Sequence, residues 1–261
     1  MSSHRQQYRR QPRRPLAALV LISILVASLP ATGAHAICNP SPAGSGFEFV
    51  AALFDANLQC SGTVLPGGWI LTAAHCGNVG HVALPHRPGQ LAIAECWSHP
   101  QFNETTLEND IAMLRIANPP AGLQGLPPVA SGWVAAKQQP LTIAGWSGCA
   151  VLAPTLGRAS VMAVPVDACI KQYQMQKSDF VISPAENLCT EVGKSRVFNA
   201  DSGGPVIVQL NGQPRLAGVI SVGVGAMSLP DRHTRMTTDY LIWIQKVQAG
   251  DKPAKSRRCG T

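Results

Sequence analysis

The chain has 261 residues, of which 46% are hydrophobic and 13% charged, a composition that excludes a disordered protein and predicts a globular protein with a large core. Its net charge of +7 gathers at the two ends, with five arginines among residues 1–14 and four basic residues against one acid in residues 251–261. The body between these ends holds 12 basic and 13 acidic residues, and it therefore predicts no nucleic-acid partner.

Residues 1–36 have the three parts of an export signal. A basic run is followed by an apolar run over residues 16–29. Small residues come next, with Ala34 and Ala36 at the two positions that a signal peptidase recognises before its cleavage site. The apolar run is shorter than the about 17–25 residues of a membrane span. We therefore predict a cleaved signal peptide and a secreted or periplasmic protein without a membrane partner. An uncleaved anchor is the alternative, and the paired arginines leave open a Sec or a twin-arginine signal.

Short apolar runs, rich in Val and Ile and bounded by Gly, Pro and Asn, predict β-strands along the rest of the chain. They lie at residues 47–54, 68–74, 90–96, 111–116, 141–146, 158–166, 205–210 and 215–224. Many short strands predict a barrel or a sandwich. The only predicted helix covers residues 237–248, with Thr237 or Thr238 as its cap and Gly250 as its end. The Pro- and Gly-rich residues 118–132 are a candidate linker between two β halves.

Three short motifs each carry one residue suited to hydrolytic chemistry: His75 in LTAAHC, Asp110 in NDIAML and Ser202 in NADSGGP. Taken singly, each has an ordinary structural role, as a packed histidine, a turn-capping aspartate or a serine in a tight bend. Together, in the order His, Asp, Ser, they resemble the trypsin-like (chymotrypsin-fold) serine proteases. Gly145-Trp146, GVISVG at 218–223, TRM at 234–236 and YLIWI at 240–244 also match that family, so the resemblance covers nearly the whole mature chain.

The resemblance implies an all-β, chymotrypsin-like fold of two six-stranded antiparallel β-barrels with a C-terminal α-helix. We expect the protease domain at 37–261, with the first barrel at about 37–132, the second barrel and helix at about 133–250, and a basic tail at 251–261. The resemblance also implies that the protein is a secreted serine endopeptidase that acts through an acyl-enzyme. Ser202 would be the nucleophile, His75 the base and Asp110 its orienting partner.

The oxyanion hole is the point at which the chain departs from the family. The resemblance assigns it to the N–H groups of Ala200 and Ser202, but the family has glycine where this chain has Ala200. Alanine is more restricted than glycine, particularly if φ must be positive. A catalytically silent binding protein on the same fold is therefore the alternative. A serine esterase of another fold would have a G-x-S-x-G elbow and its histidine last, which this chain lacks.

The substrate cleft is implied to include Ser221 and Gly223. The aspartate that some relatives carry at the base of the pocket falls near Ser195 or Arg196, neither of which is acidic. Asp231 takes a glycine's place on the far wall, where it would bind a basic side chain of the substrate. Arg196 would equally neutralise Asp231 or attract an acidic side chain, and a further alternative is that both residues point to solvent. The preference for the substrate residue before the cleaved bond stays open, with a basic residue favoured, and an Asp231→Ser variant with a peptide library tests it.

Activation in the family uses a new N-terminal Ile, whose ammonium pairs with the aspartate before the active serine, which is Asp201 here. The predicted signal-peptidase site after Ala36 is followed directly by Ile37. Because an unpaired buried carboxylate is costly, we hypothesise that signal cleavage itself creates the active N-terminus. An ordinary cleavage site that happens to precede Ile is the alternative, and N-terminal sequencing of the mature protein decides between them.

Eight cysteines in an exported chain predict disulfides. The resemblance implies the pairs Cys60–Cys76 and Cys169–Cys189. The other four allow three pairings, of which the family fold favours Cys38–Cys149 and Cys96–Cys259.

No metal or cofactor is expected. The pair His81 and His86 does not indicate a metal site, and neither does the segment between His75 and Asp110 as a whole. The expected partners are protein or peptide substrates and a protein inhibitor, with the enzyme a monomer.

Overall fold

The computed structural model describes residue 37 and the ranges 41–77, 79–146, 155–176, 178–191, 197–223 and 229–251, together with residues 193 and 195. The predicted signal peptide, Arg196, Cys38, Cys149, Cys259 and residues 252–261 lie outside the described residues. Within the described part, no helix is long and apolar enough to cross a membrane.

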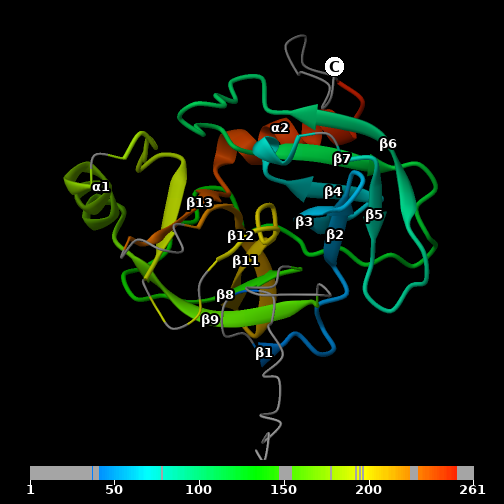
Figure 1. Ribbon diagram of the computed structural model, residues 1–261, viewed down its shortest axis with the longest axis horizontal. Helices are drawn as coiled ribbons and strands as arrows, with labels where there is room; N and C mark the ends of the chain where they lie inside the picture. Colours follow the sequence, from blue (N-terminus) through cyan, green and yellow to red (C-terminus); the bar gives the residue numbers. More distant parts are fainter. Residues whose placement is uncertain are drawn as a thin grey trace, which may run out of the picture. The chain divides into compact units, whose positions relative to one another are not determined.

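The first barrel closes six antiparallel strands in the order β2-β3-β4-β7-β6-β5 (Figure 1). The strands are β2 (Val50–Phe54), β3 (Leu58–Leu65), β4 (Trp69–Thr72), β5 (His81–Ala83), β6 (Leu91–Ser98) and β7 (Ala112–Ile116). A tight turn joins β3 to β4 and contains Gly67 and Gly68, which both have positive φ. Side chains as large as Leu53, Ile70 and Met113 are fully buried, so the barrel interior is packed rather than hollow.

The second barrel contains β8 (Pro140–Gly145), β9 (Gly157–Val164), β10 (Asn187–Thr190), β11 (Pro205–Leu210), β12 (Gln213–Val222) and β13 (Asp231–Arg235). The sheet order β9-β10-β13-β12-β11-β8 closes because β8 also pairs with β9, and β1 (Ser41–Pro42) adds to β9. β9 alternates buried and more exposed residues, the period of a strand with one face in a core. Asn211 and Gly212, both at positive φ, form the two-residue turn from β11 to β12.

The chain ends in the predicted helix, α2 (Thr238–Gln248). The side chain of Thr237 accepts a hydrogen bond from the Tyr240 N–H at 3.1 Å, which caps the helix start. Tyr240, Trp243 and Val247 are buried against the rest of the chain. The predicted fold of two six-stranded antiparallel barrels with a C-terminal helix is confirmed.

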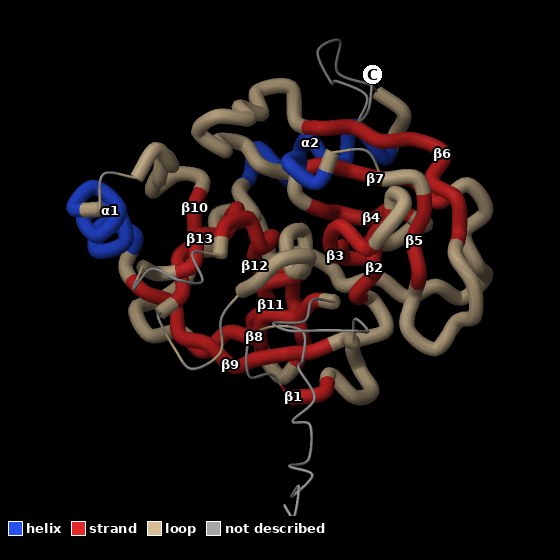
Figure 2. Tube along the Cα trace, in the orientation of Figure 1, coloured by secondary structure: helices blue, strands red, loops and turns tan. Residues whose placement is uncertain are grey.

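A second helix, α1 (Val166–Met175), was not predicted, because the apolar run that marks the preceding strand continues in the sequence to residue 166. Figure 2 shows both helices in blue among the red strands. α1 buries only Cys169 and Tyr173, so its apolar stripe is too narrow to produce a clear helical pattern. The Cys169–Cys189 disulfide anchors this short helix to β10. Strands β1, β3, β5 and β10 were also not predicted, because each is short or interrupted by polar residues.

Candidate active site

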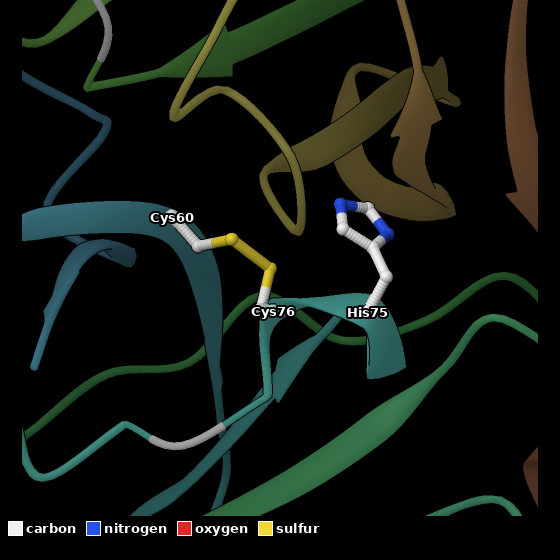
Figure 3. Close-up of side chains that lie close together, drawn as sticks. All are labelled: Cys60, His75 and Cys76. Atoms are coloured by element: carbon white, nitrogen blue, oxygen red, sulfur yellow. A yellow bond between two sulfur atoms is a disulfide. The ribbon is translucent and has the colours of Figure 1, made fainter. Parts of the chain in front are cut away.

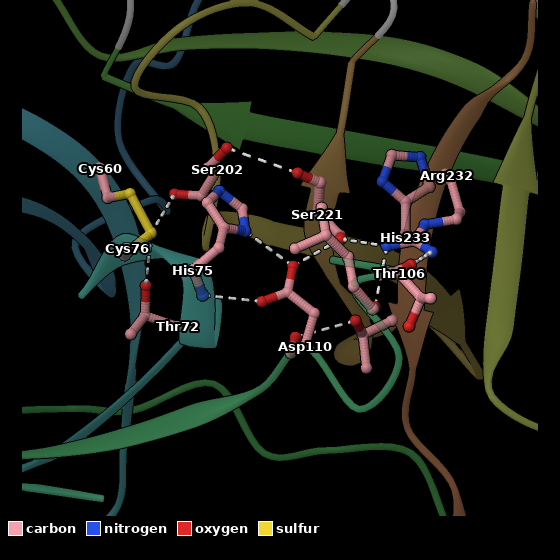
Figure 4. A network of polar contacts seen from close by, with 12 residues as sticks. Cys60, Thr72, His75, Cys76, Thr106, Asp110, Ser202, Ser221, Arg232 and His233 are labelled. Carbon is pink, nitrogen blue, oxygen red and sulfur yellow. Dashed lines mark hydrogen bonds and ion pairs between the residues drawn. A yellow bond between two sulfur atoms is a disulfide. The ribbon is translucent and has the colours of Figure 1, made fainter. Parts of the chain in front are cut away.

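The candidate site gathers residues from both barrels (Figure 4). His75 lies in a 3-10 turn (Ala74–Cys76) that follows β4, and Asp110 lies just before β7, in the first barrel. Ser202 lies in the turn that leads into β11, and Ser221 lies within β12, in the second barrel. The sequence places these residues far apart, and the closure of the two barrels brings them together.

The imidazole of His75 is held by the carboxylate of Asp110. Nδ1 of His75 lies 2.7 Å from Oδ2 of Asp110, and the His75 N–H donates to Oδ1 at 2.9 Å. The hydroxyl of Ser221 donates to Oδ2 at 2.6 Å. Burial raises the pKa of the fully buried Asp110, but its hydrogen bonds and charge interaction with His75, and the Ser221 hydroxyl, outweigh burial and lower the pKa. An ionised Asp110 keeps the proton on Nδ1, which leaves Nε2 as the acceptor.

A disulfide lies directly beside this histidine (Figure 3). Cys60 of β3 is bonded to Cys76, the residue after His75, which ties the histidine turn to the barrel wall. Potential ligand atoms of Cys60, His75 and Cys76 lie within 4.8 Å of one another. Both sulfurs are used in the disulfide and offer no thiolate, so this group does not have the donors of a metal site.

The turn around Ser202 is fixed from both barrels. The Ser61 N–H of β3 donates to the Ser202 carbonyl at 2.8 Å, and the Gly203 N–H donates to the Ile220 carbonyl of β12 at 2.7 Å. Gly203 has a φ of +83°, and a β-carbon there would collide with Thr72 and with the Ser61 carbonyl. Only glycine fits where the Ser202 turn lies this close to the first barrel, which explains why glycine follows the serine.

The Ser202 hydroxyl donates to the Ser221 carbonyl at 3.5 Å, a long and weak contact. Among the described residues, no hydrogen bond joins this hydroxyl to His75. The side chain is partly exposed, and a rotation about its Cα–Cβ bond redirects the oxygen. Hydrogen bonds between a nucleophile and its base are often loose without substrate and tighten when substrate binds.

Two backbone N–H groups beside Ser202 are available to a ligand. Within the described part of the chain, neither the Ala200 nor the Ser202 N–H donates a hydrogen bond, whereas the Asp201 N–H between them donates to Phe198 at 3.1 Å. The Ala200 carbonyl accepts from the Ser61 hydroxyl at 2.8 Å, which fixes the peptide between Ala200 and Asp201. Ala200 has a φ of +69°, a conformation that alanine adopts at a penalty of about 1–2 kcal/mol.

The two residues assigned to activation are both buried. Asp201 is fully buried, its Oδ2 accepts from the Phe198 N–H at 2.9 Å, and its carboxylate lies against Gly145, where no β-carbon fits. Ile37 is also fully buried and has a φ of +50°, which is unusual for a β-branched residue. This torsion exists only while residue 36 is attached, so cleavage before Ile37 would remove the strain. Their pairing stays a prediction.

Two of the predicted substrate residues, Asp231 and Gly223, lie against Val197. Oδ2 of Asp231, which is 3% exposed, accepts from the Val197 N–H at 3.2 Å, and Gly223 lies so close to Val197 that a β-carbon would not fit. On the same face of β13, the buried His233 shares a hydrogen bond with Thr190 at 2.9 Å, and burial and the charge of Arg232 lower its pKa to about 3. His233 is therefore neutral. Arg196 lies outside the described residues, and the preference for a basic side chain stays a prediction.

Two of the expected disulfides are present, Cys60–Cys76 and Cys169–Cys189. Cys96 is also disulfide-bonded. The proposed partner of Cys96 and the pair Cys38–Cys149 fall on residues outside the described part of the chain.

Arg232 was not singled out from the sequence, although its side chain is fully buried behind Ser221. The signal was present in the strand DRHTR: its first four residues are polar or charged, and all four are buried. A strand of this kind is uncommon, because charged residues are seldom fully buried unless they are paired.

Comparison with known proteins gives one family. The sequence model of the family described as "Trypsin" matches residues 38–244. The chain is 29% identical over 230 residues to Serine protease 57 of Rattus norvegicus, covering 79% of this chain and 80% of that protein. It is 28% identical over 226 residues to Protein masquerade of Drosophila melanogaster, covering 76% of this chain but only 21% of that longer protein. The solved structure titled "Structure of GrC" has the same fold, with a TM-score of 0.65, 22% identity, and coverage of 77% of this chain and 94% of that one.

Proposed function

Because the chain belongs to the trypsin family of chymotrypsin-fold serine proteases, we propose that it is an exported serine endopeptidase that hydrolyses protein or peptide substrates through an acyl-enzyme. The observation that carries this proposal is the arrangement of His75, Asp110 and Ser202. An ionised, fully buried carboxylate orients an imidazole, and a partly exposed serine lies in a turn with two available N–H groups beside it. A base, a nucleophile and oxyanion donors are the groups that acyl transfer needs, and their arrangement supports the proposal.

In the proposed reaction, Ser202 Oγ forms a bond to the carbonyl carbon of the substrate while its proton passes to Nε2 of His75. The carbonyl oxygen becomes an oxyanion, which accepts hydrogen bonds from the Ala200 and Ser202 N–H groups. When the carbon–nitrogen bond breaks, His75 gives the proton to the leaving amine, and the acyl group stays on Ser202. Water then repeats the sequence with His75 as its base, which releases the acid and restores the serine. Asp110 stays ionised throughout and stabilises the imidazolium.

A fluorophosphonate probe tests this function directly. Its phosphorus reacts with a serine only where a base and oxyanion donors activate that serine, so we expect one covalent adduct, on Ser202, in the mature protein. Peptide mapping by mass spectrometry identifies the labelled residue, and heat-unfolded protein is the control. A folded protein that takes no probe, or takes it on another serine, contradicts the assignment.

A catalytically silent binding protein is the second candidate, and the strained Ala200 is the observation that favours it. We expect Ala200→Gly to stabilise the fold by about 1 kcal/mol, because glycine adopts positive φ without penalty. We expect turnover to change by less than about tenfold, because the N–H groups are already available and one oxyanion donor contributes roughly 10²–10³-fold. Urea unfolding and steady-state kinetics measure the two effects. A variant that turns over substrate about a hundredfold faster than the wild type would show that alanine disables the site, and would favour the silent protein.

A further inference from the structure

Arg232 is a fully buried arginine whose guanidinium lies behind the candidate site, on β13 (Figure 4). Its Nη1 donates to the carbonyls of Val181 at 2.6 Å and Thr106 at 3.3 Å. Its Nη2 donates to the carbonyl of Leu107 at 3.0 Å and to the hydroxyl of Ser221 at 3.0 Å. Four acceptors and the nearby ring of Phe180, 5.8 Å from the guanidinium carbon, hold the side chain in one place.

The hydrogen bond from Arg232 to Ser221 helps to orient the serine hydroxyl. A guanidinium can only donate hydrogen bonds, so the Ser221 oxygen must act as acceptor toward Arg232. A serine hydroxyl has a single proton, and here it is directed to Oδ2 of Asp110 at 2.6 Å. An ionised carboxylate can only accept, so the Ser221 hydroxyl donates to Asp110 while its oxygen accepts from Arg232. Arg232 therefore holds the Ser221 oxygen in the position from which its proton reaches Oδ2 of Asp110, and removing Arg232 removes one of the two contacts that orient this hydroxyl.

The charge of Arg232 has no direct carboxylate partner among the described residues, because all four acceptors are neutral oxygens. Burial lowers the pKa of Arg232, and the charge of Asp110 is the largest of the interactions that oppose this. A buried cation without a counter-charge is unfavourable. Asp110 supplies that counter-charge through Ser221, so the two buried ions stabilise each other on opposite sides of one hydroxyl.

The same strand also holds the main chain that carries Asp110. Thr234, on the same face of β13 as Arg232, donates from its hydroxyl to the Asp110 carbonyl at 2.9 Å. The Thr106 and Leu107 carbonyls belong to the loop just before Asp110, in which Leu107 and Asn109 have positive φ of 53° and 52°. Such a loop persists only when its surroundings hold it. Arg232 thus ties a strained loop of the first barrel to a strand of the second.

We propose that Arg232 is a positioning residue for the hydrolysis proposed above: it fixes the Ser221 hydroxyl and the loop before Asp110, and so keeps the Asp110 carboxylate in place behind His75. The inference rests on the proposed function for its kinetic consequences. Its structural content, the orientation of the His75–Asp110 pair, can be measured separately.

The kinetic test compares Arg232→Met, which keeps an unbranched chain of similar length but removes every donor, with Arg232→Lys, which keeps the charge. We expect kcat per active site, titrated with the fluorophosphonate probe, to fall roughly tenfold to a hundredfold in Arg232→Met, since a small displacement of a catalytic group has effects of this size. KM should stay within about twofold, because Arg232 does not touch substrate, and Arg232→Lys should recover part of kcat. Arg215→Met, on β12, is the control, because the guanidinium of Arg215 donates to no described residue other than the adjacent Pro214, whose carbonyl accepts at 2.9 Å.

A double-mutant cycle with Ser221→Ala separates this role from a general loss of packing. If Arg232 acts through Ser221, then Arg232→Met should lower kcat much less in the Ser221→Ala background than in the wild type. Equal losses in both backgrounds, or an unchanged kcat in Arg232→Met, would overturn the proposal. Because only folded, titrated sites are counted, a variant that partly misfolds does not imitate the effect, and Arg232→Lys supplies the comparison if Arg232→Met does not fold.

Proton NMR provides a readout that needs no catalysis. The short hydrogen bond from His75 Nδ1 to an ionised carboxylate should give a resonance downfield of the amide protons. We expect that resonance to shift or broaden in Arg232→Met, to be nearer the wild type in Arg232→Lys, and to be unchanged in Arg215→Met. An unchanged resonance in both Arg232 variants would refute the proposal. If the wild type neither hydrolyses peptides nor takes the probe, the proposed function fails, while this comparison still decides the role of Arg232.

Discussion

Replacing Ser202 by alanine is expected to abolish peptide hydrolysis, with kcat falling by roughly 10⁶-fold, as when the nucleophile of a triad is removed. The reason is chemical, because no other group in the site can form the acyl bond. The fold should be unaffected, since the only hydrogen bond of this hydroxyl within the described residues is the 3.5 Å contact with the Ser221 carbonyl. We expect the free energy of unfolding to change by less than about 0.5 kcal/mol.

The measurement combines hydrolysis of a fluorogenic peptide, covalent labelling by the fluorophosphonate probe and urea unfolding. Ser160→Ala, at an exposed position of β9, is the matched control and should keep full activity. Hydrolysis by Ser202→Ala at the wild-type rate would remove Ser202 from the mechanism. Loss of activity together with loss of folding would point to a structural role for the turn instead.

Replacing Asp110 by asparagine should lower kcat by about 10⁴-fold while leaving the geometry nearly intact. The asparagine amide can donate a hydrogen bond to Nδ1 of His75, which favours the tautomer in which Nδ1 carries no proton. The imidazole proton then lies on Nε2. A protonated Nε2 cannot accept the proton of Ser202. Steady-state kinetics measures the loss, and Asp55→Asn, in the exposed turn between β2 and β3, is the control.

The pH dependence of stability provides a second measurement on the same variant. The pKa of Asp110 is lowered in the folded protein, so its ionised form contributes stability that is present above the unfolded-state pKa of about 3.9. This contribution is lost as pH falls through the lower, folded-state pKa. Asp110→Asn should therefore be less stable than the wild type at pH 7, and the difference should shrink in acid. A difference that grows as pH falls would mean that the pKa of Asp110 is raised, not lowered.

Much of the fold could be predicted from local sequence patterns. The strands with clear apolar runs and the capped helix α2 were predicted, because an apolar run bounded by turn residues and a Thr cap are properties of consecutive residues. The ordered motifs around His75, Asp110 and Ser202 indicated the family, which supplied the two-barrel architecture. The helix α1 was missed because its two buried residues, Cys169 and Tyr173, are too few to mark a helix by pattern alone.

The sequence by itself determined the chemical types available: an imidazole, a carboxylate, a hydroxyl and the glycines after Ser202. Only the tertiary structure decided how they meet. His75 and Asp110 are 35 positions apart, and their hydrogen bond depends on the register between β4 and β7. The burial and the hydrogen bonds of Arg232 depend on contacts from β13 to a loop about 125 positions earlier. Such contacts form only when barrel closure removes water from both partners, and no pattern among neighbouring residues contains that information.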